Sequence, residues 1–260
     1  MRLLTLLYLL SCAPWEPLQG TIVEGTAVWE EPGTEYVLDV YLPPDAGDEL
    51  PWLLMLDGDI SFEADAHRVE EELLAGRCAP FALVGLGNGA WRDRDYTPSP
   101  ADYLQGGSAE AFFEFVGDEV VSHVETEHAI GGYSWQRGLT GHSYGGLATT
   151  WALFERQDLF RRFGATSPSL WWDDGVMFDV EEDYAASTGR LEARLYLSMG
   201  ALEVSPMNVL FDLFVATLEE RDYQDLAWTA EVLYGHEHYS SYDPAMRRAL
   251  QVLFPPDDLP

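Results

Sequence analysis

The stretch from Arg137 to Leu147 (RGLTGHSYGGL) constrains this 260-residue chain more than any other part of it. It contains Gly141-His-Ser143-Tyr-Gly145, the G-x-S-x-G pattern of a nucleophile elbow, in which a serine occupies a sharp turn between a strand and a helix. The residues before the pattern predict the end of a buried strand, and residues 147–154 (LATTWALF) predict an apolar helix. Small neighbours are needed where the two chain segments pass closely. We therefore interpret Ser143 as a nucleophile in a strained turn at the edge of a sheet.

The alternative interpretation of this stretch is a glycine-rich turn without a chemical role, because G-x-S-x-G by itself is a weak pattern. The setting favours the elbow: a strand precedes the serine, a helix follows it, and Gly146 adds a third small residue.

The amino-acid composition limits the possible folds and binding partners of this chain. A chain of this length with 47% apolar and 13% aromatic residues predicts one large globular domain. It has 14 arginines, no lysine and 45 acidic residues, a formal net charge of −31. Such a surface repels nucleic acid and anionic lipid headgroups, so we expect no nucleic-acid partner. The acidic residues are spread along the chain, which is typical of a solvated surface; adaptation to high salt would give the same pattern.

The N-terminus predicts a signal peptide over residues 1–11. Arg2 precedes the apolar run of residues 3–10, which is too short to span a bilayer and has the length of a signal-peptide core. The run ends in Leu-Leu-Ser-Cys12, which resembles the lipobox of bacterial lipoproteins, in which the cysteine is lipidated and becomes the mature N-terminus. The alternative is an ordinary secretory signal and a secreted soluble product.

We therefore expect an exported bacterial lipoprotein, periplasmic or on the cell surface, that meets the membrane only through a lipid anchor on Cys12. Residues 12–20 are interpreted as a short tether and residues 21–260 as one domain. Cys78 would then be the only thiol left, so no intramolecular disulfide is expected.

The remaining sequence alternates strand and helix patterns, which predicts an α/β fold with a mostly parallel central sheet and helices on both faces. An antiparallel hairpin, residues 21–29 and 36–42, precedes this alternation. A polar loop is expected over residues 87–107. The expected strands cover residues 52–56, 81–86, 139–140, 163–167, 194–199 and 228–234. The expected helices begin at Ser61 or Asp65 and at residues 108, 147, 173, 209 and 245.

In such sheets function gathers at the carboxyl ends of the strands. A serine nucleophile needs a base, and the base needs a third group that holds its tautomer. On this architecture the acid and then the histidine follow the nucleophile in the chain. After Ser143 only His236 and His238 remain, both in the segment after the last expected strand. The base is therefore one of these two residues.

Glu203 is the preferred acid because it directly follows a buried strand, where a short loop brings its carboxylate to the histidine. Asp173 and Asp174 come one strand too early, and Asp212 falls in an expected helix. For the oxyanion hole, the N–H of Tyr144 is one donor, and Gly58-Asp59, in the loop after the strand over residues 52–56, is expected to supply the second. The alternative is that Asp57-Gly-Asp59 is a simple turn.

Seven segments stand in an order that resembles the putative esterase (esterase D-type) family of α/β-hydrolases, most closely its enterochelin esterase-like branch. The resemblance covers residues 37–254. The segments are YLPP at Tyr41, LLMLDGD at Leu53, RDYTPS at Arg94, RGLTGHSYGGL at Arg137, SPSLWWD at Ser167, LYLSMGALE at Leu195 and GHEHYS at Gly235.

The resemblance implies an α/β-hydrolase fold and a serine hydrolase in which Ser143 is the nucleophile. It selects His238 as the base and supports Glu203 as the acid. It also implies an oxyanion N–H from Asp59. The residues that it implies for the substrate pocket are Gly58, Arg94, Tyr96, Trp171 and Trp172. The alternatives are that Arg94 only pairs with Asp93 or Asp95 and that the two tryptophans are only core residues.

The expected function is hydrolysis of a small or medium carboxylic ester through an acyl-enzyme intermediate. Siderophore, feruloyl and acetyl esters are all candidates, although a strongly acidic protein slows the approach of anionic ferric catecholates. A non-catalytic ligand-binding lipoprotein on the same fold is the alternative. We expect no cofactor and no metal, because His236 and His238 have no further ligand cluster beside them.

Overall fold

The computed structural model describes residues 15–44, 47, 49–101 and 106–257, so Cys12 and the expected signal peptide lie outside it. The described residues form a twisted nine-stranded sheet with the order β1-β3-β5-β4-β6-β7-β8-β9, in which β2 pairs with β3. The strands are β1 (Thr21–Val23), β2 (Thr26–Trp29), β3 (Thr34–Leu42), β4 (Trp52–Leu56), β5 (Ala82–Gly87), β6 (Arg137–His142), β7 (Arg162–Thr166), β8 (Arg190–Gly200) and β9 (Gln224–Leu233).

The direction of the strands confirms the predicted α/β-hydrolase architecture. Strands β4 to β9 pair in parallel, while β3 is antiparallel to β5 and forms a hairpin with β2. Every residue of β4, β5 and β7 is buried, as strands covered on both faces require. The carboxyl ends of the parallel strands therefore meet at one edge of the sheet.

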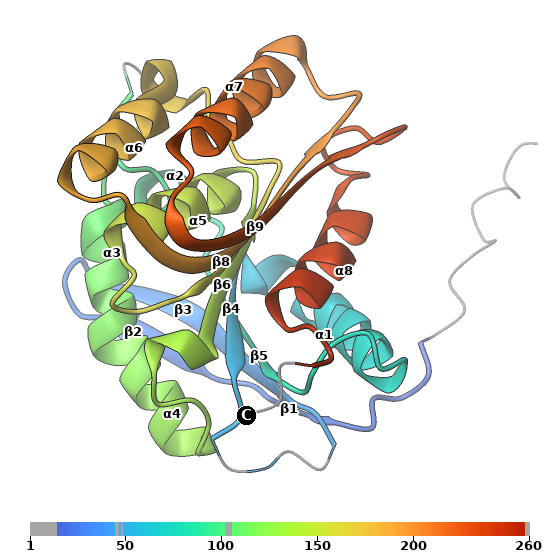
Figure 1. Ribbon diagram of the computed structural model, residues 1–260. Coiled ribbons are helices and arrows are strands. Elements are labelled where there is room, and N and C mark those ends of the chain that lie inside the picture. Colours follow the sequence, from blue (N-terminus) through green and yellow to red (C-terminus); the bar gives the residue numbers. More distant parts are fainter. Residues whose placement is uncertain (1–14, 45–46, 48, 102–105, 258–260) are drawn as a thin grey trace, which may run out of the picture.

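Helices cover both faces of the sheet (Figure 1). On one face α1 and α8 pack over β3, β5, β7 and β8 and enclose a smaller core. The helices α3, α5, α6 and α7 contribute to the larger core on the other face. The α-helices are α1 (Gly58–Leu74), α2 (Arg92–Asp95), α3 (Ala109–Phe115), α4 (Ser122–His128), α5 (Tyr144–Glu155), α6 (Val176–Ser187), α7 (Ser205–Arg221) and α8 (Tyr242–Leu253). There is also a π-helical segment, η1 (Val116–Val121), and there are two short 3₁₀-helices, η2 (Ser134–Gln136) and η3 (Trp172–Gly175).

Several element boundaries differ from the sequence-based ones. Helix α1 begins at Gly58, ahead of Ser61 and Asp65, so it starts directly at the end of β4. The expected loop of residues 87–107 contains the short helix α2. Helix α7 begins at Ser205, because the following proline is tolerated in a first helical turn. These shifts bring two helix starts to the edge of the sheet where the strands end.

The described part of the expected tether, residues 15–20, lies against α1. The ring of Trp15 is 4.4 Å from that of His67, measured between centroids. The N–H groups of Gln19 and Gly20 both donate to the carboxylate of Glu70. Within the described ranges, no helix is long and apolar enough to cross a bilayer.

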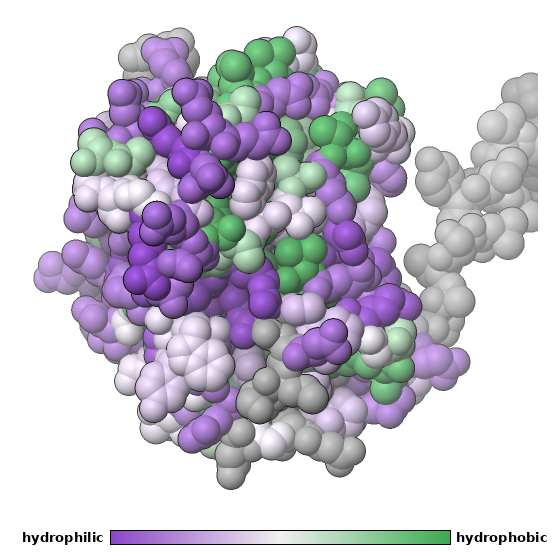
Figure 2. All heavy atoms as spheres, viewed as in Figure 1, coloured by the Kyte–Doolittle hydropathy of each residue, from purple (hydrophilic) through white to green (hydrophobic). Residues whose placement is uncertain are grey.

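The surface is largely hydrophilic, with apolar patches (Figure 2). One patch lies over α7, where Val209 and Leu213 are each about half exposed. Leu202 and Val204, on either side of the candidate acid, are also exposed.

Candidate active site

Ser143 occupies the turn between β6 and α5, as the G-x-S-x-G pattern predicts. Its backbone has φ 62° and ψ −116°, a conformation that an L-residue rarely adopts and that costs about 1–3 kcal/mol. A Cβ atom on Gly141 would lie 2.4 Å from the backbone of Gly145, and one on Gly146 would lie 2.7 Å from the carbonyl oxygen of Thr166. The Ser143 N–H donates to that same Thr166 carbonyl at 3.0 Å. Glycine at 141 and 146 is therefore what lets strand, turn and helix pass this closely.

The ends of β8 and β9 bring Glu203 and His238 together. His238 Nδ1 lies 2.7 Å from Glu203 Oε2. The other carboxylate oxygen, Oε1, accepts the N–H of Gly200 at 3.0 Å and the hydroxyl of Ser167. The Glu203 side chain is fully buried, so these contacts replace its hydration.

These contacts also set the charge of the pair. Burial by itself would raise the pKa of Glu203, but the hydrogen bonds from His238, Ser167 and the Gly200 N–H outweigh it and lower this pKa below its ordinary value. A carboxylate ionised at neutral pH fixes the proton of His238 on Nδ1 and leaves Nε2 free to accept a proton.

The two candidate histidines have different surroundings. His236 Nδ1 contacts the backbone carbonyl of Ser240 at 2.8 Å, whereas His238 contacts Glu203. The His238 ring also lies 4.6 Å from the ring of His142, the residue before Ser143. Of the two, only His238 therefore has a carboxylate partner in the part of the chain that the structure describes.

The candidate nucleophile Ser143 has another serine, rather than the candidate base, as its side-chain partner. Ser143 Oγ lies 3.4 Å from Ser169 Oγ, and among the described residues no hydrogen bond joins it to His238. Catalytic hydrogen bonds are often long without a ligand and tighten when substrate binds.

His142 is a half-buried, neutral neighbour of this pair. Burial, and then the nearby His238, lower the pKa of His142 to about 4. Its Nδ1 lies 3.0 Å from the Thr166 hydroxyl. His142 therefore adds no positive charge beside His238 at neutral pH.

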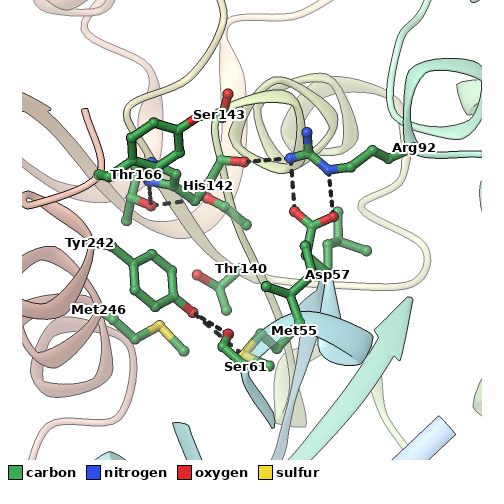
Figure 3. A pocket seen from close by; sticks show the side chains of 14 residues that line it. Met55, Asp57, Ser61, Arg92, Thr140, His142, Ser143, Thr166, Tyr242 and Met246 are labelled. Atoms are coloured by element: carbon green, nitrogen blue, oxygen red, sulfur yellow. Dashed lines mark hydrogen bonds and ion pairs between the residues drawn. The ribbon is translucent and has the colours of Figure 1, made fainter. Parts of the chain in front are cut away.

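A cavity of about 400 Å³ opens beside Ser143 (Figure 3). It lies between the ends of β4, β6 and β7 and the first turns of α1 and α8. Its lining consists of Met55, Leu56, Asp57, Ile60, Ser61, Arg92, Thr140, Gly141, His142, Ser143, Thr166, Tyr239, Tyr242 and Met246.

Sequence reasoning missed Arg92, which lines the cavity and forms a two-pronged ion pair with Asp57 at 2.6 and 2.9 Å. The guanidinium also lies 5.4 Å from the centroid of the Tyr144 ring. Burial raises the pKa of Asp57, and the bonds from Arg92 act against this. The sequence did not indicate Arg92 because α2 falls in a segment that is predicted as a loop. The nearby Arg94 has the same charge, so charge does not distinguish the two residues.

The pocket residues that the family resemblance implied do not line this cavity. Arg94 bonds to Asp95 at 2.6 Å and to the Tyr36 hydroxyl at 3.0 Å, which places it in a separate ion pair. Buried Tyr96 accepts the N–H of Asp57 on its hydroxyl oxygen.

Trp172 is buried and donates its ring N–H to the carbonyl of Ser99 at 2.8 Å. Trp171 is partly exposed, and its ring centroid lies 6.0 Å from that of Tyr144. Trp171 therefore lies on the surface next to the elbow rather than in the cavity.

Gly58 and Asp59 form the first turn of α1, beside the end of β5. The Asp59 carboxylate accepts the N–H of Gly89 at 2.8 Å, and both residues line a second surface hollow. Tyr144 is the first residue of α5, where helix geometry leaves backbone N–H groups without an intrahelical partner. The oxyanion roles of Tyr144 and Asp59 stay predictions.

The other acid candidates, Asp173, Asp174 and Asp212, are all exposed. In the described ranges no group of three or more His, Cys, Asp or Glu side chains is placed to hold a metal ion.

Comparison with known proteins adds the family. The model of the family described as "Putative esterase" matches residues 30–248. The chain belongs to this family. Its relatives include the ferri-bacillibactin esterase BesA of Bacillus subtilis, 24% identical over 185 residues, and the siderophore triacetylfusarinine C esterase of Aspergillus fumigatus, 31% identical over 157 residues.

The matches to these two relatives are partial. The first covers 62% of each chain, and the second covers 54% of this chain and 53% of the relative. Among solved structures, the BES protein from Bacillus cereus superposes with a TM-score of 0.82 and 22% identity over 94% of this chain and 98% of its own. That likeness confirms the fold.

Proposed function

We propose that this member of an esterase family is a serine carboxylic-ester hydrolase that works through an acyl-enzyme intermediate. The observation that carries the proposal is the 2.7 Å contact between His238 and a buried, ionised Glu203 beside the strained turn that holds Ser143. A histidine with a carboxylate partner can act as a general base, and a serine in a nucleophile elbow is the group from which such a base takes a proton.

The reaction would have two halves. His238 Nε2 takes the proton of Ser143 Oγ as that oxygen bonds to the ester carbonyl carbon, and the N–H groups of Tyr144 and Asp59 stabilise the resulting oxyanion. The carbon–oxygen bond to the alcohol then breaks, and His238 returns the proton to the leaving alcohol. A water molecule, deprotonated by His238, attacks the acyl-enzyme, and the acid leaves as Ser143 regains its proton.

The substrate class is a small or medium ester. The names of the relatives favour a siderophore ester, but the net charge of −31 disfavours anionic ferric catecholates. Feruloyl, acetyl and other neutral esters therefore stay candidates. A graded panel of p-nitrophenyl esters tests the proposal: turnover of any member supports it, and no turnover across the panel would favour a non-catalytic binding protein.

Replacing Glu203 by glutamine is expected to lower kcat by about tenfold or more, because a neutral amide no longer stabilises the imidazolium of His238. The measurement is kcat of both proteins on one activated ester.

The difference in stability between the wild type and Glu203→Gln should also depend on pH. The folded-state pKa of Glu203 is lowered, so its stabilisation is present above the ordinary value of 4.5 and is lost as pH falls through the lower folded-state pKa. Urea unfolding of both proteins from pH 7 to pH 3 measures this. A stability gap that stays constant over this range would contradict the role assigned to Glu203.

We also propose that Cys12 is lipidated and anchors the mature protein at the periplasmic membrane or the cell surface. The support is the apolar run that ends in Leu-Leu-Ser-Cys12. Two or more acyl chains would make this anchor stable. Mass spectrometry of the protein extracted from membranes should find a diacylated or triacylated Cys12 as the first residue. An unmodified N-terminus at another position would show ordinary secretion.

A further inference from the structure

The cavity beside Ser143 is larger than an acetyl group requires. Its volume of about 400 Å³ corresponds to about a dozen non-hydrogen atoms, on the scale of roughly 30 Å³ for a water molecule in the liquid. Its walls include Met55 from β4, Ile60 from α1 and Met246 from α8, which are apolar. An apolar group that leaves water for this space is stabilised by about 0.8 kcal/mol per methylene, which is roughly a fourfold change in an equilibrium constant.

The part of the cavity away from Ser143 carries two hydroxyl groups. Figure 3 shows Ser143 on one side and Ser61 and Tyr242 on the other. Ser61 Oγ donates to Asp65 Oδ2 at 2.6 Å, and Tyr242 Oη donates to the same oxygen at 2.9 Å. When both protons are donated to Asp65, the two oxygens offer lone pairs to a ligand.

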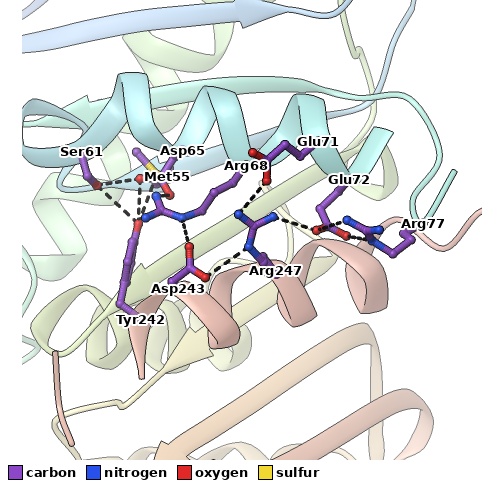
Figure 4. A network of polar contacts seen from close by, with 10 residues as sticks. All are labelled: Met55, Ser61, Asp65, Arg68, Glu71, Glu72, Arg77, Tyr242, Asp243 and Arg247. Atoms are coloured by element: carbon purple, nitrogen blue, oxygen red, sulfur yellow. Dashed lines mark hydrogen bonds and ion pairs between the residues drawn. The ribbon is translucent and has the colours of Figure 1, made fainter. Parts of the chain in front are cut away.

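These hydroxyl groups are held in place by a network between α1 and α8 (Figure 4). Asp65 is completely buried, and its second oxygen bonds to Arg68 at 2.8 Å. Arg68 in turn bonds to Asp243 in the first turn of α8 at 2.6 Å. With Asp65 bound on both oxygens, Ser61 and Tyr242 cannot easily turn their protons toward the cavity, so this end of the cavity accepts hydrogen bonds.

The position of the base indicates which part of an ester enters the cavity. His238 must reach the oxygen of the leaving alcohol to protonate it. The neighbouring rings of His142 and Tyr239 line the cavity, and His238 itself does not. This arrangement favours an alcohol that leaves on the side of His238 and an acyl group on the side of the cavity.

We propose that this cavity is the acyl-binding site and that it selects an acyl group with an apolar body and a hydroxyl group at its far end. The inference rests on the proposed esterase function and names its substrate class. Ser61 and Tyr242 are the residues that recognise the hydroxyl group, and Met246 limits the size of the apolar body.

The test compares p-nitrophenyl acetate, octanoate, 8-hydroxyoctanoate, 3-phenylpropanoate and 3-(4-hydroxyphenyl)propanoate. In the wild type, kcat/KM should rise from acetate to the longer esters, and each hydroxylated ester that fits should exceed its parent by roughly two- to tenfold, the range of one neutral hydrogen bond. The aliphatic and aromatic pairs show which body fits better. Acetate as the best substrate, or no preference for a hydroxyl group in either pair, would overturn the proposal.

Two variants and a control locate the effect. Met246→Phe should lower the ratio of kcat/KM for 8-hydroxyoctanoate over acetate by about tenfold, because the ring fills the cavity. Ser61→Ala should remove most of the hydroxyl preference while octanoate stays favoured over acetate. Val252→Phe, on α8 outside the cavity lining, should keep both ratios. Equal ratios in Met246→Phe and the wild type would place the acyl group elsewhere.

A binding measurement separates failure of this inference from failure of the proposed function. In a Ser143→Ala background, calorimetry with methyl 8-hydroxyoctanoate should detect binding that is several-fold weaker for methyl octanoate and weakened again by Met246→Phe. If the wild type hydrolyses no ester but this binding pattern is found, the cavity is still an acyl site and the esterase proposal is wrong. Absence of binding in this background overturns the acyl site even if esters are hydrolysed.

Discussion

Replacement of Ser143 by alanine is expected to lower kcat on an activated ester by at least about 10⁴-fold, because in the proposed mechanism Ser143 Oγ is the atom that forms the acyl-enzyme bond. The variant should stay folded. Alanine occupies the same backbone conformation, φ 62° and ψ −116°, at a similar cost. Ester hydrolysis and labelling by a fluorophosphonate probe are the two measurements, and both should disappear together.

A matched control is Ser187→Ala, at the exposed end of α6 far along the chain from the elbow. This variant should keep wild-type hydrolysis and full labelling. Probe labelling that persists in Ser143→Ala would show that another residue is the nucleophile.

The second large effect is expected at His238. His238→Ala should lower kcat by several orders of magnitude, because triad residues act as a unit. His236→Ala should cost about tenfold or less, since the His236 ring contacts the backbone carbonyl of Ser240 and, within the described residues, has no carboxylate partner. The measurement is kcat/KM of both variants on one activated ester, with folding checked by circular dichroism. An inactive His236→Ala beside an active His238→Ala would reverse the assignment.

The loop after β9 places His236 and His238 in different surroundings. Both follow β9, but the backbone turns between them, and the Ser241 hydroxyl bonds to the His238 carbonyl at 2.7 Å while also approaching Ser167. Ser167 in turn donates to Glu203. These hydroxyl contacts join the loop that carries His238 to the end of β8, where Glu203 lies.

Local patterns in the sequence were sufficient for the fold class and for the sharp turn that holds Ser143. Burial and close backbone approach restrict which side chains fit at a position, so the local sequence indicates its surroundings. Examples are the apolar run of β4, the glycine at 141 and the amphipathic helix α8. Chain order restricted the base to two histidines, and the family resemblance then selected His238. Its 2.7 Å contact with Glu203 agrees with that choice.

The mostly parallel sheet, the elbow and a short set of candidates for the acid and base could be predicted from the amino-acid sequence, because they follow from periodicity, turn chemistry and order along the chain. Only the folded structure shows that Arg92 rather than Arg94 lines the cavity. It also shows that Ser61 and Tyr242 meet at Asp65, although α1 and α8 lie at opposite ends of the chain. Neighbouring arginines have the same charge and nearly the same local pattern, so only packing separates them. A cavity is shaped by side chains from distant segments, and no local pattern in the sequence reports its volume or its polarity.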